Sequence, residues 1–479
     1  MKKTNRSISA ILGFFILFFP LLISSPVHVS ASNDFADIAM SCYTFTPGVS
    51  NSQRLDVSGG NFSNGTNVQT WSANGTISQM FYVVPERSGW YRICNIISQK
   101  VIDVAGGDMR SGTNVQIYDW NGTDAQLWRF RDAGNGYYYI ENKSGFFLDV
   151  GGGGTTDGTN VQIYEGNRTS AQKWKLEPCE GIYTFISGLS SSKCMDVFNG
   201  SFDNGSNIHL WSTNNTAAQR FLVKKESSGW YSILNIASGK AIDVCSAKVG
   251  SGVNVQLYDY NKTDAQLWKF YSAGNGYYYI QNKLGYYLDV NTGNTADGTN
   301  IQVYDGNGTA AQKWKLCAAD LTENMFTTLM VDLYEKGLTY QNDPLGKLIF
   351  YFQNFRTGSI YDIKNANVWN NLFPEIEYPG FQGVILYDNI FMTPEQLGNY
   401  IYGFSGRLLG FSDRTIYQGG GYAASGKTYL SDPSNYYGDS AIDHEYIRRG
   451  IERTGKNGTI DVDISRYKNV LDVASKILS

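Results

Sequence analysis

The strongest constraint on the fold is a duplication, because residues 43–177 and 183–317 correspond position by position at a displacement of 140. "YTF" at Tyr43 recurs at Tyr183, and longer stretches such as "GNGYYYI" recur in the same register. No insertion breaks the correspondence, so two copies of one domain stand in tandem. A short link around Pro178 joins them.

Each copy is itself threefold, with a period of 46 to 47 residues. Every unit contains "DV" or an equivalent, a Gly- and Asn-rich stretch, and a Gln two positions before Phe or Trp. A unit of ~45 residues cannot bury its apolar face alone, whereas three units closing on one another can. Each unit has about four short alternating runs, which predicts twelve strands per copy. The Asp and motif Gln, always 23 residues apart, form the pairs Asp56–Gln79, Asp103–Gln126, Asp149–Gln172, Asp196–Gln219, Asp243–Gln266 and Asp289–Gln312.

The composition agrees with short strands and polar turns. Among 479 residues there are 52 Gly and 34 Tyr, and only 17% are charged. The net charge of −4 provides no overall cationic field for nucleic acid, so we expect no nucleic-acid binding through the repeats. Three His and no CxxC pair leave little material for a metal cluster, and the sequence predicts neither a metal nor a cofactor.

This QxW pattern, present in six of six units over about 275 residues, resembles the ricin-B-type lectin family, whose fold is the β-trefoil. The fold prediction is therefore all-β tandem β-trefoils, of twelve strands each with pseudo-threefold symmetry, followed by a mainly α C-terminal domain. The predicted divisions are a signal peptide at 1–31, trefoils at 41–178 and 181–317, and a last domain at 320–479.

Two further positions are constant in each unit, a Gln (His209 in one unit) 13 residues after the Asp and an aromatic residue 15 after it. The spacing of two places both side chains on one face of a strand. A carboxylate and an amide bind sugar hydroxyls, and an aromatic ring stacks on the apolar face of a pyranose. The resemblance implies pockets lined by the Asp, the aromatic residue and a later Asn. The candidate carbohydrate-binding residues are Asp56, Gln69, Trp71, Asp103, Gln116, Tyr118, Asn121, Asp149, Gln162, Tyr164, Asn167, Asp196, Trp211, Asp243, Gln256, Tyr258, Asn261, Asp289, Gln302, Tyr304 and Asn307.

Other interpretations stand beside these. The Gln and Trp of the QxW motif are core and strand-turn elements, and each Asp could serve only to cap a turn. The unit with His209 is the weakest candidate. Galactose-binding members of the resembled family often have Asn just before the motif Gln, where this chain has Ala125, Ala171 or another small residue. The sugar therefore stays open, with a polysaccharide or cell-wall glycan fitting equally well.

The N-terminus predicts export. Lys2, Lys3 and Arg6 precede an apolar run from Ile11 to Ile23, which is short for a membrane span. We expect cleavage after Ala31 and a secreted, extracellular protein without a transmembrane anchor. Six Cys remain in any of 15 pairings. First and last strands are neighbours in a trefoil, so the resemblance makes Cys42 and Cys179 one candidate pair.

Beyond Asp320 the pattern becomes helical. The sequence predicts a helix over 321–338, one beginning at Thr393 with Pro394 at its first position, and one with Ser440 as N-cap and Gly455 as stop. Residues 346–358 fit a helix or a strand. Glycines within the second helix favour close packing against another element.

Four stretches of this region, "YDIK", "GNYIYGFSGRLLGF", "YQGGGYA" and "GDSAIDHEYIRRGIE", resemble the bacterial polymorphic toxin type 44 domain. The resemblance implies a secreted effector toxin, with an immunity protein as a possible partner. The candidate catalytic residues are Asp439, Asp443, His444 and Arg448. The near-neutral pKa of His makes His444 a natural general acid or base, and Arg448 lies on the same helix face. Alternatively, His444 is a solvated helix residue.

Three functions are consistent with this sequence. The first is a secreted carbohydrate-binding protein that delivers or anchors a toxin-like effector on glycan-bearing targets. The second is a non-catalytic lectin or adhesin. The third is a polysaccharide hydrolase with trefoil anchors, although ~160 residues are too few for a barrel glycosidase. Whether the last domain is a hydrolase, acting on nucleic acid or on cell wall, stays open.

Overall fold

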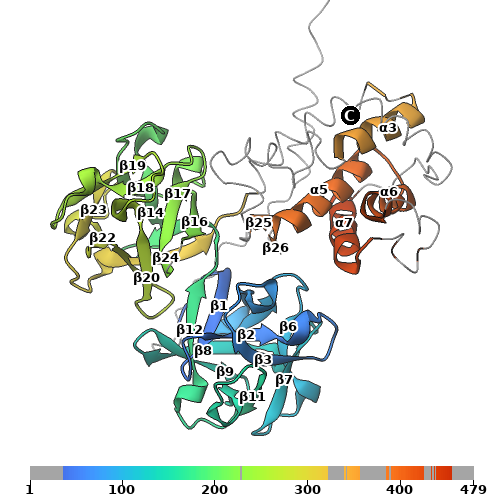
Figure 1. The fold of residues 1–479 in the computed structure, drawn as a ribbon, viewed down its shortest axis with the longest axis horizontal. Helices are drawn as coiled ribbons and strands as arrows, with labels where there is room; N and C mark the ends of the chain where they lie inside the picture. Colours follow the sequence, from blue (N-terminus) through green and yellow to red (C-terminus); the bar gives the residue numbers. More distant parts are fainter. Residues whose placement is uncertain are drawn as a thin grey trace, which may run out of the picture.

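The structure is a computed structural model that describes residues 36–226, 229–321, 339–340, 342–355, 385–387, 390–425, 433, 436 and 439–455. The predicted signal peptide and almost all of the helix expected over 321–338 lie outside these ranges. Figure 1 shows two units built of strands and a third that contains the four described helices. The predicted fold class is confirmed.

Six strands of the first unit pair in a closed ring, in the order β1, β4, β5, β8, β9, β12 and back to β1. Three hairpins, β2–β3, β6–β7 and β10–β11, cover one end of this barrel, and their second strands pair with one another. Closure satisfies the strand edges and produces the threefold arrangement of a trefoil. The strands of this first trefoil are β1 (Ser41–Pro47), β2 (Gln53–Val57), β3 (Thr66–Ser72), β4 (Phe81–Pro85), β5 (Tyr91–Asn95), β6 (Val101–Val104), β7 (Thr113–Tyr118), β8 (Trp128–Gly134), β9 (Tyr137–Asn142), β10 (Phe147–Val150), β11 (Thr159–Tyr164) and β12 (Lys173–Pro178).

The second trefoil has the same topology. Its ring runs β13, β16, β17, β20, β21, β24 and back to β13, and its hairpins are β14–β15, β18–β19 and β22–β23. Its strands are β13 (Gly181–Ser187), β14 (Lys193–Val197), β15 (Ile208–Ser212), β16 (Phe221–Lys225), β17 (Tyr231–Asn235), β18 (Ala241–Val244), β19 (Val253–Tyr258), β20 (Trp268–Ser272), β21 (Tyr278–Asn282), β22 (Tyr287–Val290), β23 (Thr299–Tyr304) and β24 (Lys313–Ala318).

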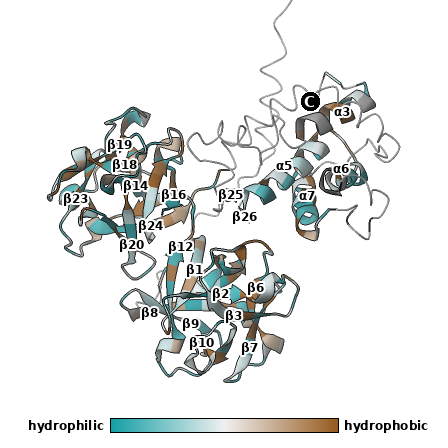
Figure 2. Ribbon diagram, in the orientation of Figure 1, coloured by the Kyte–Doolittle hydropathy of each residue, from teal (hydrophilic) through white to brown (hydrophobic). Residues whose placement is uncertain are grey.

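Burial alternates along strands such as β7, and Figure 2 shows hydrophilic and hydrophobic segments mixed within the strands of both trefoils. In β7, Val115 and Ile117 are buried, whereas Gln116 and Tyr118 on the other face reach solvent. Trp128 and its three equivalents in the other QxW units are fully buried, which agrees with the structural interpretation of the motif Trp.

The third unit contains α3 (Pro344–Phe355), α5 (Pro394–Leu408), α6 (Asp413–Ser425) and α7 (Ala441–Arg453), with a hairpin of β25 (Ile385–Tyr387) and β26 (Ile390–Met392). The predicted start at Thr393 is confirmed, and Gln396 completes a capping box that the sequence analysis missed. The predicted N-cap at Ser440 is confirmed too. Residues 346–355, left open between helix and strand, are helical. No helix in the described part of the chain is long and apolar enough to cross a bilayer.

The β25–β26 hairpin lies between the two trefoils (Figure 1). Leu386 and Phe391 belong to an apolar cluster with the first trefoil, where the Phe391 ring centroid lies 4.8 Å from that of Tyr82. Ile385 and Met392, which alternate with these residues, belong to a cluster that includes the second trefoil and the helices. The helical unit is therefore packed against both trefoils, a contact that repeat analysis alone does not reveal.

Cys42 and Cys179 are neighbours, with their Sγ atoms 2.9 Å apart. The Cys179 N–H donates to the Cys42 carbonyl (3.1 Å), which ties the start of the first trefoil to its end. Ile182 and Ala319 occupy the corresponding positions of the second trefoil.

We expect treatment with oxidised glutathione to form a disulfide between these two cysteines. The bond would close a loop spanning 137 positions and stabilise the first trefoil by about 3–5 kcal/mol. Thiol titration and denaturant unfolding of the oxidised and reduced forms measure this effect, with Cys42→Ser as the control. An unchanged thiol count, or equal unfolding midpoints in the two forms, would contradict the pairing.

Candidate functional site

The six hairpins place each candidate Asp directly opposite its Gln or His partner. In β6–β7, Asp103 pairs with Gln116, and the Gln116 Nε2 donates to the Asp103 Oδ1 (2.9 Å). The equivalent Gln-to-Asp distances are 3.1, 3.0, 3.3 and 3.1 Å for Gln69–Asp56, Gln162–Asp149, Gln256–Asp243 and Gln302–Asp289. The Gln therefore orients the carboxylate, a role that the sequence analysis did not assign to it.

The aromatic residue of each hairpin lies two positions beyond the Gln, on the same face. Tyr118 pairs across the hairpin with Val101, two positions before Asp103. The described residues contain eleven strongly exposed large apolar side chains, and five of them belong to this set: Trp71, Tyr118, Trp211, Tyr258 and Tyr304. Tyr164, the sixth, is half-buried. A ring left in water beside an oriented carboxylate is available to stack on a ligand.

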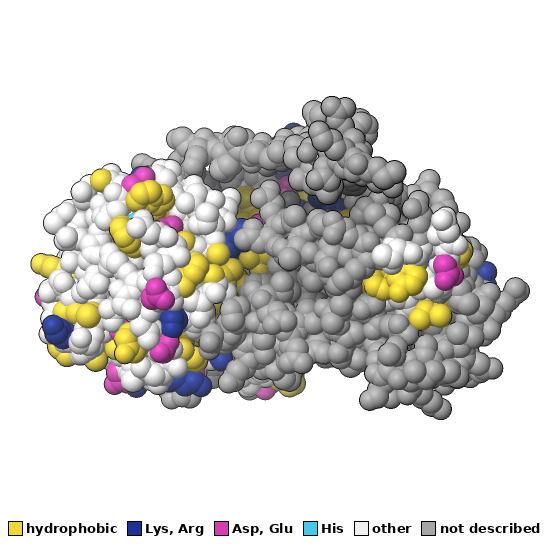
Figure 3. Space-filling view, turned by 90° about the horizontal axis from the view of Figure 1, so that it is seen from above, with side chains coloured by type: hydrophobic (Ala, Val, Ile, Leu, Met, Phe, Trp, Pro, Cys, Tyr) yellow, Lys and Arg dark blue, Asp and Glu magenta, His cyan; other side chains and the backbone are white. Residues whose placement is uncertain are grey.

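Figure 3 shows one surface of the second trefoil, where hydrophobic side chains form separate patches with acidic side chains close by. Small, separate patches suit small sugar units better than one continuous protein interface.

The candidate Asn residues shape the loop after the aromatic residue. The Asn121 Oδ1 accepts from the Thr123 N–H (3.0 Å). Asn167, Asn261 and Asn307 make the same Asx turn, as do Asn74 and Asn214, which the sequence analysis did not include. The side-chain oxygen is thus engaged in the turn, so the Nδ2 donor is the group that a sugar hydroxyl would meet.

The motif Gln closes the same loop from beneath. The fully buried Gln126 accepts from the Asn121 N–H (2.8 Å) and donates to the Asp119 carbonyl (2.8 Å). All six motif Gln residues form this pair of bonds. Where Trp follows, its indole N–H donates to the carbonyl just before the Asp, as from Trp128 to Ile102 (3.2 Å). The motif therefore positions both sides of the site from the core.

Gln126→Ala is expected to destabilise the first trefoil by about 2 kcal/mol, because it removes a fully buried amide and leaves two part-buried backbone groups without their partner. Gln281→Ala is the matched control, since the exposed Gln281 amide makes a single bond to the Gly285 carbonyl and its loss should cost under about 0.5 kcal/mol. Urea unfolding measures both variants. Equal losses would show that the motif Gln has no special structural role.

Burial raises the pKa of Asp56, Asp103, Asp149, Asp243 and Asp289 above the ordinary Asp value, and the hydrogen bonds from the Gln amides offset part of this rise. Each carboxylate still accepts more hydrogen bonds than the Gln residues supply. Two vicinal hydroxyls could occupy the remaining positions.

The hairpin with His209 differs in its chemistry. The His209 Nε2 lies 2.8 Å from the Asp196 Oδ1, and the ring stacks on Trp211 at a centroid distance of 5.1 Å. Phe198, strongly exposed, packs edge-on against His209. This hairpin presents more aromatic surface and fewer amide groups than the other five.

In the helical unit, the structure brings Asp443 to the N-terminus of α7 rather than to His444. The Asp443 carboxylate accepts from the Ser440 Oγ (2.8 Å) and from the Asn399 side chain. Arg448 is bound to Glu445 (2.7 and 2.8 Å) and to Glu452. Both residues therefore have structural partners that account for them. Asp362 and Lys364 of the "YDIK" stretch, and Asp388, lie outside the described residues.

His444 is held by rings. Its imidazole stacks on the Tyr417 ring at a centroid distance of 4.1 Å and lies tilted against the Tyr436 ring at a centroid distance of 5.1 Å. Burial lowers the pKa of His444 below its ordinary value, with Glu445 opposing this effect and Arg448 adding to it. The imidazole is consequently neutral near pH 7 and able to accept a proton. Asp439 caps the turn before α7, where its Oδ1 accepts from the Ser440 N–H (2.9 Å).

The ricin-type beta-trefoil lectin domain-like model matches six overlapping segments, residues 37–118, 77–164, 124–211, 170–258, 217–304 and 264–371. These segments cover more than half of the chain. The chain belongs to the ricin-type β-trefoil lectin domain-like family. It therefore contains carbohydrate-binding domains of the ricin-B lectin type.

No curated protein matches the chain. Among solved structures, the designed threefold-symmetric protein ThreeFoil is 33% identical, with 29% of this chain and 99% of that chain covered and a TM-score of 0.28. A mosquitocidal holotoxin is 19% identical, with 58% and 34% covered and a TM-score of 0.28. The Rhizoctonia solani agglutinin is 22% identical, with 29% and 96% covered and a TM-score of 0.27.

Proposed function

We propose that this lectin is an exported protein whose six hairpin sites bind a repeating glycan and thereby anchor the helical unit, as an effector, on glycan-bearing targets. The observation that carries the glycan-binding part is the recurrence of one arrangement: an oriented carboxylate beside an aromatic ring on six hairpins, with the ring exposed in five of them. Each site alone offers one carboxylate and one ring, so we expect the affinity for a monosaccharide to be only millimolar. Several sites on one chain raise retention on a polymer without any new contact.

Retention on immobilised polysaccharides tests the proposal. The full chain without residues 1–31 is compared with a six-Asn variant, in which Asp56, Asp103, Asp149, Asp196, Asp243 and Asp289 are all Asn. Asn preserves the shape and one acceptor while it removes the charge. We expect retention of the parent on at least one glycan and its loss in the six-Asn variant. Equal behaviour of the two proteins on every glycan would remove the proposal.

Retention is expected to fall on acidification, with a midpoint above the ordinary Asp pKa, because protonation removes the acceptor that the hydroxyls need. The raised pKa values mean that the ionised carboxylates slightly disfavour folding, and this cost disappears as the pH falls through the folded-state pKa. The fold should therefore outlast binding between about pH 7 and pH 4. Circular dichroism monitors the fold. The six-Asn variant has no titratable group at the six substituted positions, so any residual retention should not change with pH. A midpoint at or below the ordinary value would contradict this prediction.

The effector role rests on the resemblance to the type 44 toxin domain and on His444, a neutral imidazole held against Tyr417. Such an imidazole suits a general base in a hydrolytic reaction. The bond cleaved and the immunity partner are left open. A non-catalytic lectin or adhesin is the alternative, in which α7 serves only to pack the unit.

Expression of the chain without residues 1–31 in the bacterial cytoplasm distinguishes these functions. We expect the chain to arrest growth and His444→Gln to relieve this arrest. Arg449→Gln, a control substitution on the same helix, should not relieve it. His444 makes no side-chain hydrogen bond within the described residues, so its replacement spares the helix cap. Absence of arrest in both cytoplasm and periplasm would favour the non-catalytic lectin.

A further inference from the structure

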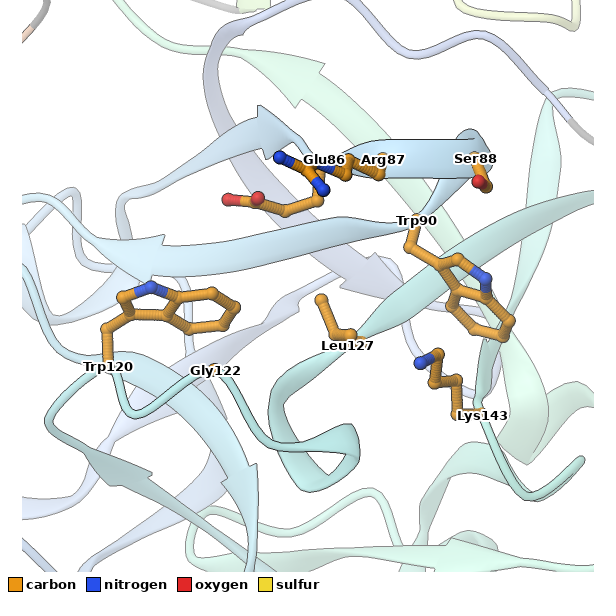
Figure 4. Close-up of a pocket in the computed structure, with 8 residues that line it drawn as sticks. All are labelled: Glu86, Arg87, Ser88, Trp90, Trp120, Gly122, Leu127 and Lys143. Atoms are coloured by element: carbon orange, nitrogen blue, oxygen red, sulfur yellow. The ribbon is translucent and has the colours of Figure 1, made fainter. Parts of the chain in front are cut away.

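A hollow of about 340 Å³ lies on the first trefoil, beside the loop that follows β7. Trp90, Trp120 and Leu127 form its apolar walls, and Glu86, Arg87 and Lys143 line its rim. Figure 4 shows the two indoles on opposite sides with Leu127 between them. We name it the Trp90 pocket. Trp120 and Gly122 flank Asn121 of the β6–β7 site, but the four candidate residues of that site, Asp103, Gln116, Tyr118 and Asn121, do not belong to the lining.

Both indoles are held in place before any ligand arrives. The Arg92 guanidinium lies 5.1 Å from the Trp120 ring centroid and is paired with Glu86 (2.9 Å). The Arg129 guanidinium lies 4.7 Å from the Trp90 ring centroid and is bound to Glu141. Rings fixed by cation–π contacts and ion pairs lose little freedom on binding, which favours affinity in a small site.

The charge around the pocket is unbalanced. Arg87 forms no hydrogen bond or ion pair within the described part of the chain. Lys143 forms an ion pair with Asp124, and Arg129 and Arg131 both form ion pairs with Glu141. The charged residues that line the pocket are two cations, Arg87 and Lys143, and one carboxylate, Glu86, which is paired with Arg92. This surplus favours an anionic ligand and disfavours a cationic one such as a quaternary ammonium.

Size and chemistry together define the ligand class. The volume is within the range of small-molecule sites, about 300–1,000 Å³. Two indoles around an apolar floor suit the C–H faces of a pyranose, and the free guanidinium suits a carboxylate. We propose that the Trp90 pocket is a seventh saccharide site, specific for a pyranose that carries a carboxylate, such as a uronic acid. Its existence does not require the hairpin sites to bind sugar.

The second trefoil provides an internal comparison. Tyr260 stands where the first trefoil has Trp120, and its hydroxyl donates to Glu226, the counterpart of Glu86. Tyr260 also packs against the cluster shared with the helical unit. Ser232 replaces Arg92, and the cations over the Tyr260 ring are instead Lys224 and Lys262, at 5.7 and 5.4 Å. Ser227 stands where the first trefoil has Arg87, so the second trefoil lacks the guanidinium that would bind the carboxylate. The acidic-sugar site is therefore a property of the first trefoil, and Trp120→Tyr introduces a residue that this fold already accommodates.

Saturation-transfer NMR with methyl glucuronide and methyl glucoside, which differ only at C6, tests the site. Both are measured on the six-Asn variant, so that the hairpin sites are disabled and a failure of the proposed glycan function does not affect the result. We expect saturation transfer to methyl glucuronide. The affinity for methyl glucoside should be lower by a factor of about 10 or more. Arg87→Gln should weaken glucuronide binding by about 10-fold, and Trp90→Ala and Trp120→Tyr should weaken it further.

Three outcomes would overturn the proposal. Equal binding of the two glycosides, unchanged in Arg87→Gln, would remove the preference for an acid. Glucuronide binding that survives both Trp90→Ala and Trp120→Tyr would place the ligand elsewhere. Absence of transfer to methyl glucuronide in the folded six-Asn variant, or saturable choline binding that both tryptophan substitutions abolish, would exclude a saccharide at this pocket.

Discussion

Replacing the ring of all six hairpins with Ala is expected to lower retention on a polysaccharide at least about 100-fold. The substituted residues are Trp71, Tyr118, Tyr164, Trp211, Tyr258 and Tyr304. A single replacement should lower retention only a few-fold, because the other sites keep the chain bound to the polymer. The loss should therefore steepen as rings are removed in sequence. Isothermal titration on a soluble polysaccharide, or a retention series on immobilised polysaccharide, measures the dependence.

Tyr271→Ala is the matched control for this series. Tyr271 is 44% exposed, against 39% for Tyr118, but it lies on β20 of the barrel and not on a hairpin. Its removal should leave retention unchanged. Because the six rings lie at the surface, the unfolding midpoint of the six-ring variant should stay close to that of the parent. Full retention by that folded variant would show that the rings do not carry binding.

Gly450→Ala is expected to dislodge α7 from α5 and destabilise the helical unit by about 3 kcal/mol or more. A Cβ at Gly450 would lie 1.9 Å from the Tyr400 carbonyl oxygen, and one at Gly403 would lie 2.1 Å from the Ile447 carbonyl oxygen. Both obstacles are backbone atoms, so no rotamer change relieves the overlap. The two glycines thus let the helices cross at close range, as the glycine-rich sequence predicted.

Hydrogen exchange with mass spectrometry resolves the effect by segment. Faster exchange is expected in α5 and α7, with protection of the trefoil barrels maintained. Gly420→Ala on α6 is the control, because its Cβ would approach the mobile end of the Ile447 side chain at 2.8 Å and the Asp439 Oδ2 at 3.1 Å. That substitution should cost less than about 1.5 kcal/mol. Unchanged exchange in Gly450→Ala would contradict the close crossing.

Much of the trefoil architecture is predictable because the repeat contains its own evidence. Six copies of one pattern separate the constant positions from the variable ones without any second sequence. The constant Asp, Gln and aromatic residues at intervals of 13 and 15 predicted a shared face, and β6–β7 has that face. The helical unit occurs once, so no internal comparison distinguished Asp443 as a helix-capping residue from Asp443 as a catalytic one.

The sequence by itself determined the two barrels, their threefold units and the six carboxylate–ring pairs, because these depend on local alternation and on short hairpin contacts. Only the tertiary structure decided three other features. These are the hydrogen bonds that assign Gln116 to Asp103, the β25–β26 hairpin between the trefoils and the pocket between Trp90 and Trp120. The Gln116–Asp103 bond lies within one hairpin, but its geometry is set only when β6 and β7 pair. The β25–β26 hairpin and the pocket depend on side chains from segments that the repeat period does not relate, and such neighbours are defined only when the whole chain is folded.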